Sequence, residues 1–460
     1  MNKKLLCLVL FAQTTWCGLM AQDVDSQTPH HDWEDETVFA INKEYIGITG
    51  DIIHPGIINI IQKATTYGRV IVGLLTESAI ADHKRLPYLN YDQRKKVIEN
   101  IKGVSEVIPQ KEWSYLPNLK KLRPNYIIHG DDWKTNYLQK IRAEVYAFMN
   151  EIGGEVIEIP YYQGIDSDKL LQNAKSIGTT PDIRLKSLRV LIESKPIIRI
   201  LEAHSCLSAL IIENMSVEVG DDVNRFDGIW NSSIIDSTSK GKPNLGLSNR
   251  MQTLTEILES TTKPIIYDED QIITSSNLNY TINNLESNGI SAIVIRDQIS
   301  RKYESVYEEK DFCTMIKEGK KAQITKDFII IARIEEMLYD KSIDEALKKA
   351  ISCVMSGADV ILIESKDKTA NNIKEFCEKF RKDYPKTPIA VITSNFKEIK
   401  EKEISKWGVN IFIYENQMLR SSYPAMKKCA ETILDNQRSL EANKLCMPIK
   451  EILTLIPGTS

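Results

Sequence analysis

The sequence predicts an α/β protein with two domains, an open, doubly wound sheet followed by an eight-stranded (β/α)8 barrel. Two observations lead to this fold class. Short apolar runs alternate with stretches of helical periodicity along most of the 460 residues. Beyond about residue 178, eight such runs recur at regular intervals. Most of them end in polar side chains, as parallel strands do at a ligand-binding rim.

The overall composition narrows the classes of function. The net charge is -4, from 59 basic and 63 acidic residues, and no basic tract is present. The charge pattern therefore gives no support for nucleic-acid binding. The eight cysteines form no CxxC or Cys/His cluster, which argues against a metal finger or a disulfide scaffold. No apolar run reaches about 18 residues, so no transmembrane helix is predicted.

The amino terminus has the pattern of a secretory signal peptide. Lys3 and Lys4 precede a short apolar segment, residues 5–12, and the small residue Ala21 precedes Gln22. We predict a signal peptide over residues 1–22 and an acidic, unstructured spacer over residues 23–43. The alternative is a wrongly assigned start codon or an extension that is not cleaved.

The first domain is predicted over residues 44–175, with alternating strands and helices. The predicted strands are 45–49, 69–76, 125–129 and 155–160, and the predicted helices lie near 57–67 and 91–103. In doubly wound sheets, ligands bind beyond the carboxyl ends of the strands, where helix amino termini can hold phosphate. The polar residues collected at those ends are His54, Lys84, Arg85, His129, Asp131 and Asp132.

Four segments of this domain resemble motifs of the cytidylyltransferase (nucleotidyltransferase) family. His54-Pro55-Gly56-Ile57 lines up with the HxGH motif that follows the first strand. Lys84-Arg85-Leu86-Pro87, Asp92-Gln93-Arg94 and His129-Gly130-Asp131-Asp132-Trp133 are similar to later motifs. The resemblance implies a Rossmann-like nucleotidyltransferase domain that binds CTP. The nucleotide-binding residues that it implies are His54, Gly56, Lys84, Arg85, His129 and Asp131.

Two positions of the domain depart from the family pattern. Ile57 stands where the family has its second motif histidine, and it can neither donate a hydrogen bond nor carry charge. Near the end of the domain, Asp166 and Asp168 would lie near phosphates and repel them. The domain is therefore predicted to keep the fold while its cytidylyl transfer is weakened or lost.

The second domain is predicted over residues 178–435, with a tail over residues 436–460. Helical stretches separate most of its strands, and one of them, Ile343–Met355, ends at Ser356-Gly357, where glycine can cap a helix. Eight strand–helix units in about 250 residues are typical of a TIM-type barrel. The predicted strands are 198–204, 226–232, 264–270, 292–297, 328–335, 359–364, 389–393 and 410–414.

The third of these strands ends in two carboxylates, Asp268 and Asp270. Their i, i+2 spacing places both side chains on one face of a strand. Carboxylates at the carboxyl ends of barrel strands suit Mg²⁺, which prefers oxygen ligands. Taken alone, the stretch also fits a solvated acidic turn. Polar ends of other strands favour a ligand site, and they include Glu202, His204, Ser232, Arg333, Glu335 and Glu364.

Segments throughout this domain resemble the phosphoenolpyruvate mutase family of the isocitrate lyase superfamily. They are Leu201-Glu202-Ala203-His204, Phe226–Trp230 with Ser232, Asp268-Glu269-Asp270, Ile331–Glu335, Gly357-Ala358-Asp359 and Leu419-Arg420. A nucleotidyltransferase domain followed by such a barrel is similar to the arrangement in bifunctional enzymes of phosphonate biosynthesis.

The resemblance implies isomerisation of phosphoenolpyruvate to phosphonopyruvate with Mg²⁺ as cofactor. It implies that Asp268 and Asp270 hold the metal, with Asp297 as a further metal residue, and that Arg333 holds the phosphoryl oxygens. Trp230 and Ser232 would shape the catalytic pocket. It also implies a homo-oligomer and a cytoplasmic location, which the predicted signal peptide contradicts, so the localisation stays open.

Several departures from the family pattern lie around this pocket. Asn244 stands where the family has an aspartate, and Arg296-Asp297-Gln298 replaces Glu-Asp-Lys. Glu304 and Glu364 replace an asparagine and a histidine. Three hypotheses follow: a divergent mutase with a degenerate cytidylyltransferase domain, a pseudoenzyme that binds a phosphorylated ligand or an active paralogue, and a related phosphonopyruvate hydrolase or 2-oxo acid lyase.

Overall fold

The computed structural model describes residues 42–134, 138–160, 179–220, 222–243, 245–269, 275–300, 305–339 and 341–455. The predicted signal peptide and nearly all of the acidic spacer lie outside these ranges. So do Asp270, Asn244, Glu304 and the segment that contains Asp166 and Asp168.

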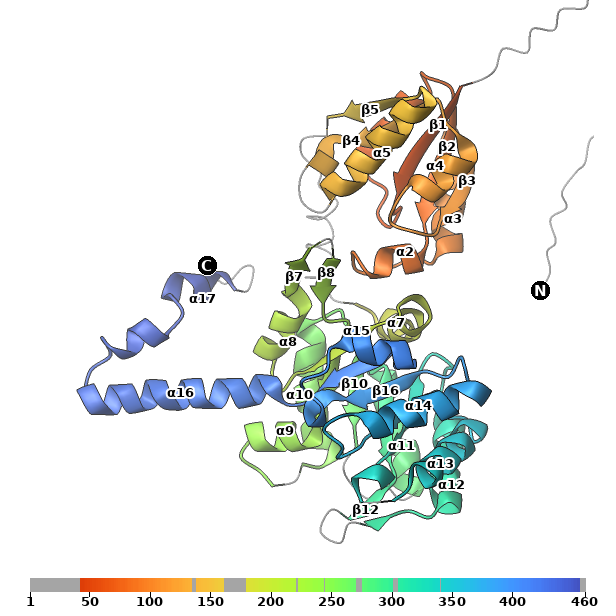
Figure 1. Cartoon of the computed structure of the whole chain (residues 1–460). Coiled ribbons are helices and arrows are strands. Elements are labelled where there is room, and N and C mark those ends of the chain that lie inside the picture. The colour runs from red at the N-terminus through yellow and green to blue at the C-terminus, as the bar shows by residue number, and fades with distance from the viewer. Residues whose placement is uncertain are drawn as a thin grey trace, which may run out of the picture. The chain divides into compact units, whose positions relative to one another are not determined.

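The first domain is built on a five-stranded parallel sheet with the order β3-β2-β1-β4-β5 (Figure 1). Tyr45 and Ile46, neighbours on β1, belong to two separate hydrophobic clusters, one with Ile127 and the other with Val72. Both faces of the sheet are therefore covered, as predicted for a doubly wound fold. Its elements are β1 (Lys43–Ile48), α1 (Pro55–Ala64), β2 (Arg69–Leu75), α2 (Glu77–Ala81), α3 (Tyr91–Glu99), β3 (Val104–Gln110), α4 (Leu116–Leu122), β4 (Tyr126–Gly130), the 3-10 helix η1 (Asp131–Lys134), α5 (Leu138–Ile152) and β5 (Glu155–Ile159).

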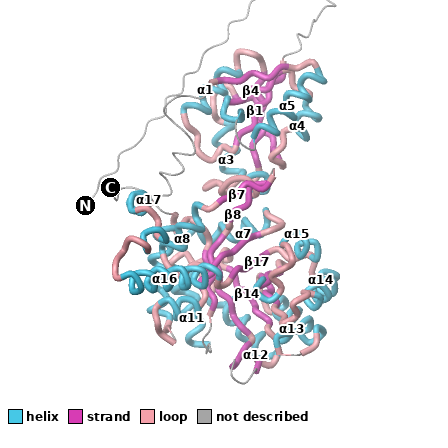
Figure 2. Tube along the Cα trace, turned by 60° about the vertical axis from the view of Figure 1, so that its left-hand side comes forward, coloured by secondary structure: helices cyan, strands magenta, loops and turns pink. Residues whose placement is uncertain are grey.

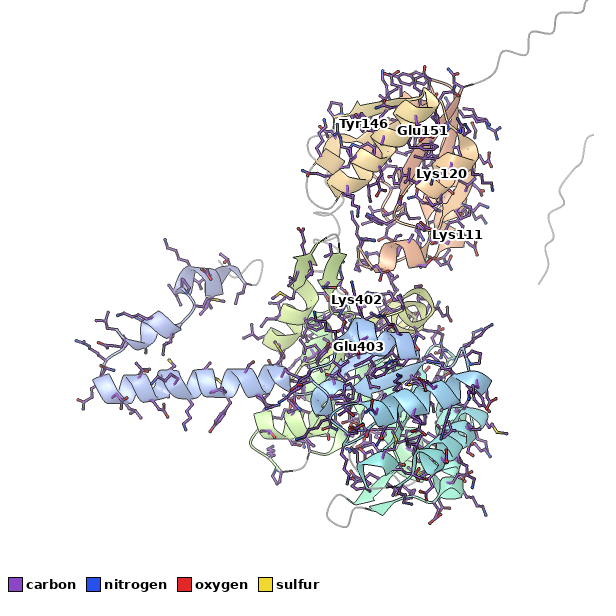
Figure 3. All side chains as sticks on the ribbon, viewed as in Figure 1. Lys111, Lys120, Tyr146, Glu151, Lys402 and Glu403 are labelled. Carbon is purple, nitrogen blue, oxygen red and sulfur yellow. The ribbon has the colours of Figure 1, made fainter. Side chains whose placement is uncertain are left out.

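The helices of this domain are amphipathic. In α5, Val145 and Met149 are buried in a core cluster, whereas Glu151 lies exposed at the outer surface (Figure 3). Helix α1 begins with Pro55, whose missing N–H costs nothing at the first turn, and it buries Ile61.

Strand β3 was missed by the sequence analysis, which extended the preceding helix to Gly103. Helix α3 ends at Glu99, and β3 follows as an edge strand next to β2. Polar residues, Ser105 and Glu106, and the proline Pro109 hide the apolar pattern of this strand. All three are tolerated because an edge strand is covered by protein on fewer sides than a central one.

The second domain is a closed barrel of eight parallel strands in the order β10-β11-β14-β15-β16-β17-β6-β9 (Figure 2). All eight predicted strands are present, each one to three residues shorter than predicted. They are β6 (Ile198–Glu202), β9 (Gly228–Asn231), β10 (Ile265–Asp268), β11 (Ala292–Arg296), β14 (Ile329–Ile334), β15 (Val360–Ile363), β16 (Ile389–Ile392) and β17 (Ile411–Tyr414).

Helices surround the barrel, and two short hairpins interrupt the strand–helix alternation. The hairpins, which the sequence analysis did not predict, are β7 (Ser216–Val219) with β8 (Asp222–Arg225), and β12 (Gln298–Ser300) with β13 (Ser305–Val306). The helices are α7 (Pro181–Ser194), α8 (Cys206–Asn214), α9 (Ser233–Ser239), α10 (Leu247–Ser260), α11 (Ser275–Ser287), α12 (Glu309–Ala322), α13 (Ile343–Met355), α14 (Asn371–Asp383), α15 (Glu401–Ile404) and α16 (Gln417–Asn436).

Side chains of each barrel strand alternate between two hydrophobic clusters. On β14, Ile329 and Ile331 belong to one cluster, which fills the barrel, whereas Ile330 and Ile334 pack with the surrounding helices. Helix α7 adds Leu188 and Leu191 to the inner cluster. The interior is therefore a packed apolar core, and polar residues reach it only at the strand ends.

Beyond the barrel the chain continues through α16, the 3-10 helix η5 (Ala442–Leu445) and α17 (Ile449–Thr454). Helices α16 and α17 have no buried residue. Within the part of the chain that the structure describes, no helix combines the length and the apolar character needed to cross a membrane.

Candidate functional site at the barrel rim

Strand alternation determines which polar side chains enter the barrel. On β11, Ala292 and Val294 belong to the inner cluster, so Arg296 lies on the same face. The register pairs Arg296 with Arg333 of β14. We call five residues at the carboxyl ends of the strands the rim cluster: Asp268, Arg296, Arg333, Glu335 and Glu364.

Arg333 is the centre of the rim cluster. Its Nη1 lies 3.2 and 3.4 Å from the two carboxylate oxygens of Asp268. Its Nε lies 2.9 Å from Oε1 of Glu335 and also contacts Oε1 of Glu364. Burial opposes the charge of the guanidinium, but the three carboxylates outweigh this effect and raise the pKa of Arg333 above its usual value.

Carboxylates outnumber cations in the rim cluster. Arg296, the second guanidinium, pairs with Glu335 at 2.6 Å, so three acids face two arginines. Burial raises the pKa of Glu364 to about 7, although Arg333 favours its ionised form. Oε2 of Glu335 is buried and has no hydrogen-bond partner among the described residues. The cluster therefore has a spare buried acceptor and an excess of acid.

The two other predicted catalytic residues lie on or beside β9. Trp230 belongs to the inner cluster and is completely buried, and its indole N–H finds no acceptor within the described residues. An unpaired buried N–H is costly, which suits a group that donates to a bound ligand. Ser232 is buried and precedes α9, where its side chain makes no capping hydrogen bond.

Arg250 of α10 positions this edge of the barrel, and the sequence analysis missed it. It is 1 % exposed and donates to the backbone oxygen of Asp268 at 2.8 Å. It also donates to the backbone and side-chain oxygens of Asn231, at 3.0 and 2.7 Å, and its guanidinium lies 3.9 Å from the ring centre of Tyr267. An arginine on the core face of an amphipathic helix, one turn from Leu254, was the available signal.

Glu202 connects the first barrel strand to α16. One carboxylate oxygen accepts the backbone N–H groups of Met418 and Leu419 at 3.1 and 3.2 Å, in the first turn of that helix. The other lies 2.6 Å from Nδ1 of His204. Both residues were predicted as polar strand ends, and in the structure they position a helix.

Asp297, predicted as a metal residue, is next to the rim cluster in the chain, but its side chain faces the helical layer. Its position one residue after Arg296 turns it to the outer face of β11, toward the helices. One oxygen accepts the backbone N–H of Glu335 at 3.0 Å, and the other lies 3.2 Å from Nζ of Lys349 on α13. Because this carboxylate faces Lys349 of the helical layer and not the barrel interior, we leave Asp297 out of the proposed metal site.

In the first domain the predicted nucleotide-binding residues gather at neighbouring strand ends. His54 follows β1 and His129 is the second-last residue of β4, and these two strands pair at the point where the strand order reverses. This is where doubly wound sheets bind ligands. Gly56 donates its N–H to Nδ1 of His54 at 3.2 Å. The His129 ring stacks on the Trp133 ring, with the ring centres 3.9 Å apart.

The remaining predicted residues of this domain lie in the loops around the same edge. Arg85 pairs with Asp51 at 2.8 Å, and its guanidinium lies 3.9 Å from the ring centre of Tyr88. The backbone N–H of Lys84 donates to the backbone oxygen of Ile80 in α2 at 2.8 Å. Asp131 begins η1 directly after β4.

Two family models match the chain. Residues 47–175 match the model described as cytidylyltransferase-like, and residues 188–434 match the model described as phosphoenolpyruvate phosphomutase. The chain belongs to the phosphoenolpyruvate phosphomutase family.

Relatives within this family carry different activities in their names. A phosphoenolpyruvate phosphomutase of Tetrahymena pyriformis is 29% identical over 281 residues, 58% of this chain and 89% of that protein. A phosphonopyruvate hydrolase of a Variovorax species is 26% identical over 284 residues, 59% of this chain and 93% of that protein. The solved structure of a phosphonopyruvate hydrolase with oxalate and Mg²⁺ superposes with a TM-score of 0.53 at 26% identity, covering 59% of this chain and 94% of that chain.

The rim cluster of this phosphomutase-family barrel fits a divalent cation by its ligand chemistry. Mg²⁺ is commonly held by one or two carboxylates together with waters and substrate oxygens. Asp268 offers such a carboxylate, and the spare oxygen of Glu335 lies in the same cluster. Among the described residues, which exclude Asp270, no group of three or more His, Cys, Asp or Glu forms a metal cage. The fit is therefore to the carboxylates of Asp268 and Glu335, and Mg²⁺ would take its other ligands from water or substrate.

The raised pKa of Glu364 predicts a measurable pH dependence of stability. An unfolded glutamate titrates near pH 4.3, so between about pH 4.5 and 7 the folded chain holds this proton more tightly. Raising the pH through this window lowers the free energy of unfolding. In Glu364→Gln the loss between about pH 5 and pH 8 should be smaller by roughly 1–3 kcal/mol, as measured by urea unfolding.

Glu378→Gln, which changes an exposed acid on α14, is the matched control and should titrate like the parent chain. Asp297, whose pKa burial also raises to about 7, is unchanged in all three proteins and cancels in the comparison. An identical pH slope in Glu364→Gln and the parent would contradict the assignment.

Proposed function

We propose that the barrel interconverts phosphoenolpyruvate and phosphonopyruvate with Mg²⁺ as cofactor, next to a degenerate cytidylyltransferase domain. The observation that carries this proposal is the buried pair of Asp268 and Arg333 at the rim of a phosphomutase-family barrel. The name of the Tetrahymena relative supports the substrate.

The residues have complementary roles in this proposal. Asp268, with Asp270, would hold Mg²⁺, which when bound stabilises the enolate and carboxylate oxygens of the substrate. The planar guanidinium of Arg333 would bind phosphoryl oxygens. Trp230 would donate its unpaired indole N–H to the substrate. The apolar barrel interior beneath the rim excludes water from the migrating phosphoryl group.

A second candidate function is binding without efficient turnover. Arg333 already contacts three carboxylates, so a phosphoryl group has to displace at least one of them. Glu364 is the residue at the family's histidine position, and its negative charge competes directly with an anionic substrate. This observation favours a pseudoenzyme that keeps affinity for a small anion.

A third candidate is hydrolysis of phosphonopyruvate or lysis of a 2-oxo acid. The relative named phosphonopyruvate hydrolase, with 26% identity, makes this a close alternative. The products separate the reactions, because a hydrolase releases phosphate and pyruvate whereas a mutase releases phosphoenolpyruvate alone.

For the first domain we infer nucleotide binding without cytidylyl transfer. Ile57 packs against the apolar cluster of the sheet, so no second imidazole follows His54 to stabilise phosphate charge in the transition state. Release of pyrophosphate from CTP above the background rate would contradict this inference.

Replacing Asp268 tests the mutase directly. The parent chain with Mg²⁺ should convert phosphonopyruvate to phosphoenolpyruvate in a coupled assay, and a chelator should abolish the reaction. Asp268→Ala should lower kcat/KM on the order of 100-fold or more, because a cation ligand is lost. Arg333 keeps Glu335 and Glu364 as partners, so the fold should survive.

Glu256→Ala, an exposed acid on α10, is the control and should match the parent. Mutase activity of the parent no higher than that of Asp268→Ala would rule out the mutase. Release of phosphate from phosphonopyruvate would instead show that the chain is a hydrolase.

Oxalate binding tests whether the rim cluster still binds a small anion. With Mg²⁺ present, titration calorimetry should detect oxalate, the ligand named with the hydrolase structure. Glu364→Gln should bind it about tenfold more tightly, about 1.4 kcal/mol, because one competitor for Arg333 is neutralised. Glu378→Gln should leave the affinity unchanged. Oxalate binding without turnover would support the pseudoenzyme, and an unchanged affinity in Glu364→Gln would contradict the role of Glu364.

A further inference from the structure

Two cysteines approach each other at the C-terminal end of the described chain. Cys429 lies on α16, and Cys446 follows η5. Their Sγ atoms are 3.9 Å apart, and the Cys446 thiol donates to the backbone oxygen of Ala442 at 3.3 Å. The contact therefore connects a long helix to the segment that folds back along it.

Both thiols are accessible to a reagent. Cys446 is exposed and Cys429 is half-buried, whereas Cys313, Cys353 and Cys377 are buried in the barrel domain. Accessible thiols exchange with disulfides, and buried ones are usually inert.

A disulfide at this position needs little movement. Its sulfur atoms lie about 2.05 Å apart, so each Sγ has to move by only about 1 Å from its present position. Rotation about the χ1 angles of two surface side chains can supply that distance without moving any core residue.

The segment that contains Cys446 has few other contacts. Over residues 437–455, Ala442 is the one buried residue. On α17, Ile449 is 69% exposed and Ile452 is 48% exposed. Since apolar burial contributes little here, a covalent bond to α16 would be the main restraint on this segment.

We propose that Cys429 and Cys446 form a reversible disulfide that fastens residues 437–455 to α16. One thiolate attacks a low-molecular-weight disulfide, which breaks its S–S bond and releases one thiol. The second cysteine thiolate then displaces the other half, so the two cysteines are oxidised and the reagent is reduced to two thiols. The two cysteine protons pass to the departing thiolates. No metal or substrate of the barrel takes part.

Peptide mapping of the full chain tests the bond. After incubation with oxidised glutathione and digestion without reductant, mass spectrometry should find the peptides of Cys429 and Cys446 linked, and dithiothreitol should separate them. Cys206→Ser, which removes an exposed thiol on α8, should leave this link intact. Separate glutathione adducts on both cysteines, or a link between two copies of the chain, would overturn the proposal.

Hydrogen exchange tests the restraint. Backbone amides of residues 437–455 should exchange on the order of tenfold more slowly in the oxidised chain than in the reduced chain. In Cys429→Ser and Cys446→Ser these amides should exchange as fast as in the reduced parent chain, both with and without oxidant. Exchange that is unaffected by oxidation, with the bond present, would show that the disulfide does not hold the segment.

Discussion

The rim of the barrel depends on the charge of one buried side chain, Arg333. Arg333 is 5% exposed, and its guanidinium lies among Asp268, Glu335 and Glu364, on three different strand ends. None of these carboxylates could remain ionised at such depth without a cation, and the arginine could not remain there without them. Removing Arg333 would leave the three carboxylates with one cation, Arg296, whereas removing one carboxylate still leaves Arg333 two partners. The strand ends are therefore fixed as a group.

The same balance limits what the site can bind. A phosphorylated substrate adds negative charge to a rim where acids already outnumber arginines, so a cation has to enter with it or a carboxyl has to be neutralised. Mg²⁺ satisfies the first condition, and the raised pKa of Glu364 is a step toward the second. A histidine, which the sequence resemblance implies for the family at this position, would instead add a donor. Under the proposed function, the choice between catalysis and binding in this chain would thus depend on the side chain of Glu364 beside Arg333.

Much of the fold could be predicted from the sequence because barrel strands are buried on both faces. Continuous apolar runs marked all eight, from β6 to β17, whereas the edge strand β3 carries polar residues and was missed. The rim was harder. Strict alternation along β11 already placed Arg296 inside and Asp297 outside, and applying it would have removed Asp297 from the metal residues. The contact between Glu364 and Arg333 was not predicted, because it depends on the register of the neighbouring strands β14 and β15, which the sequence pattern does not give.

Arg250 shows that the architecture and the chemistry of the site are separate properties. From the helical layer it donates hydrogen bonds to the backbone of Asp268 and Asn231. Among the described residues, it forms no hydrogen bond to any other member of the rim cluster. Its hydrogen bonds persist whether the carboxylate of Asp268 binds a metal or stays with Arg333. Arg250 therefore fixes the backbone at the ends of β9 and β10 independently of the side-chain contacts around Arg333. The shape of this edge and the charges of the rim cluster are thus set by different residues, and under the proposed function the charges decide between catalysis and binding.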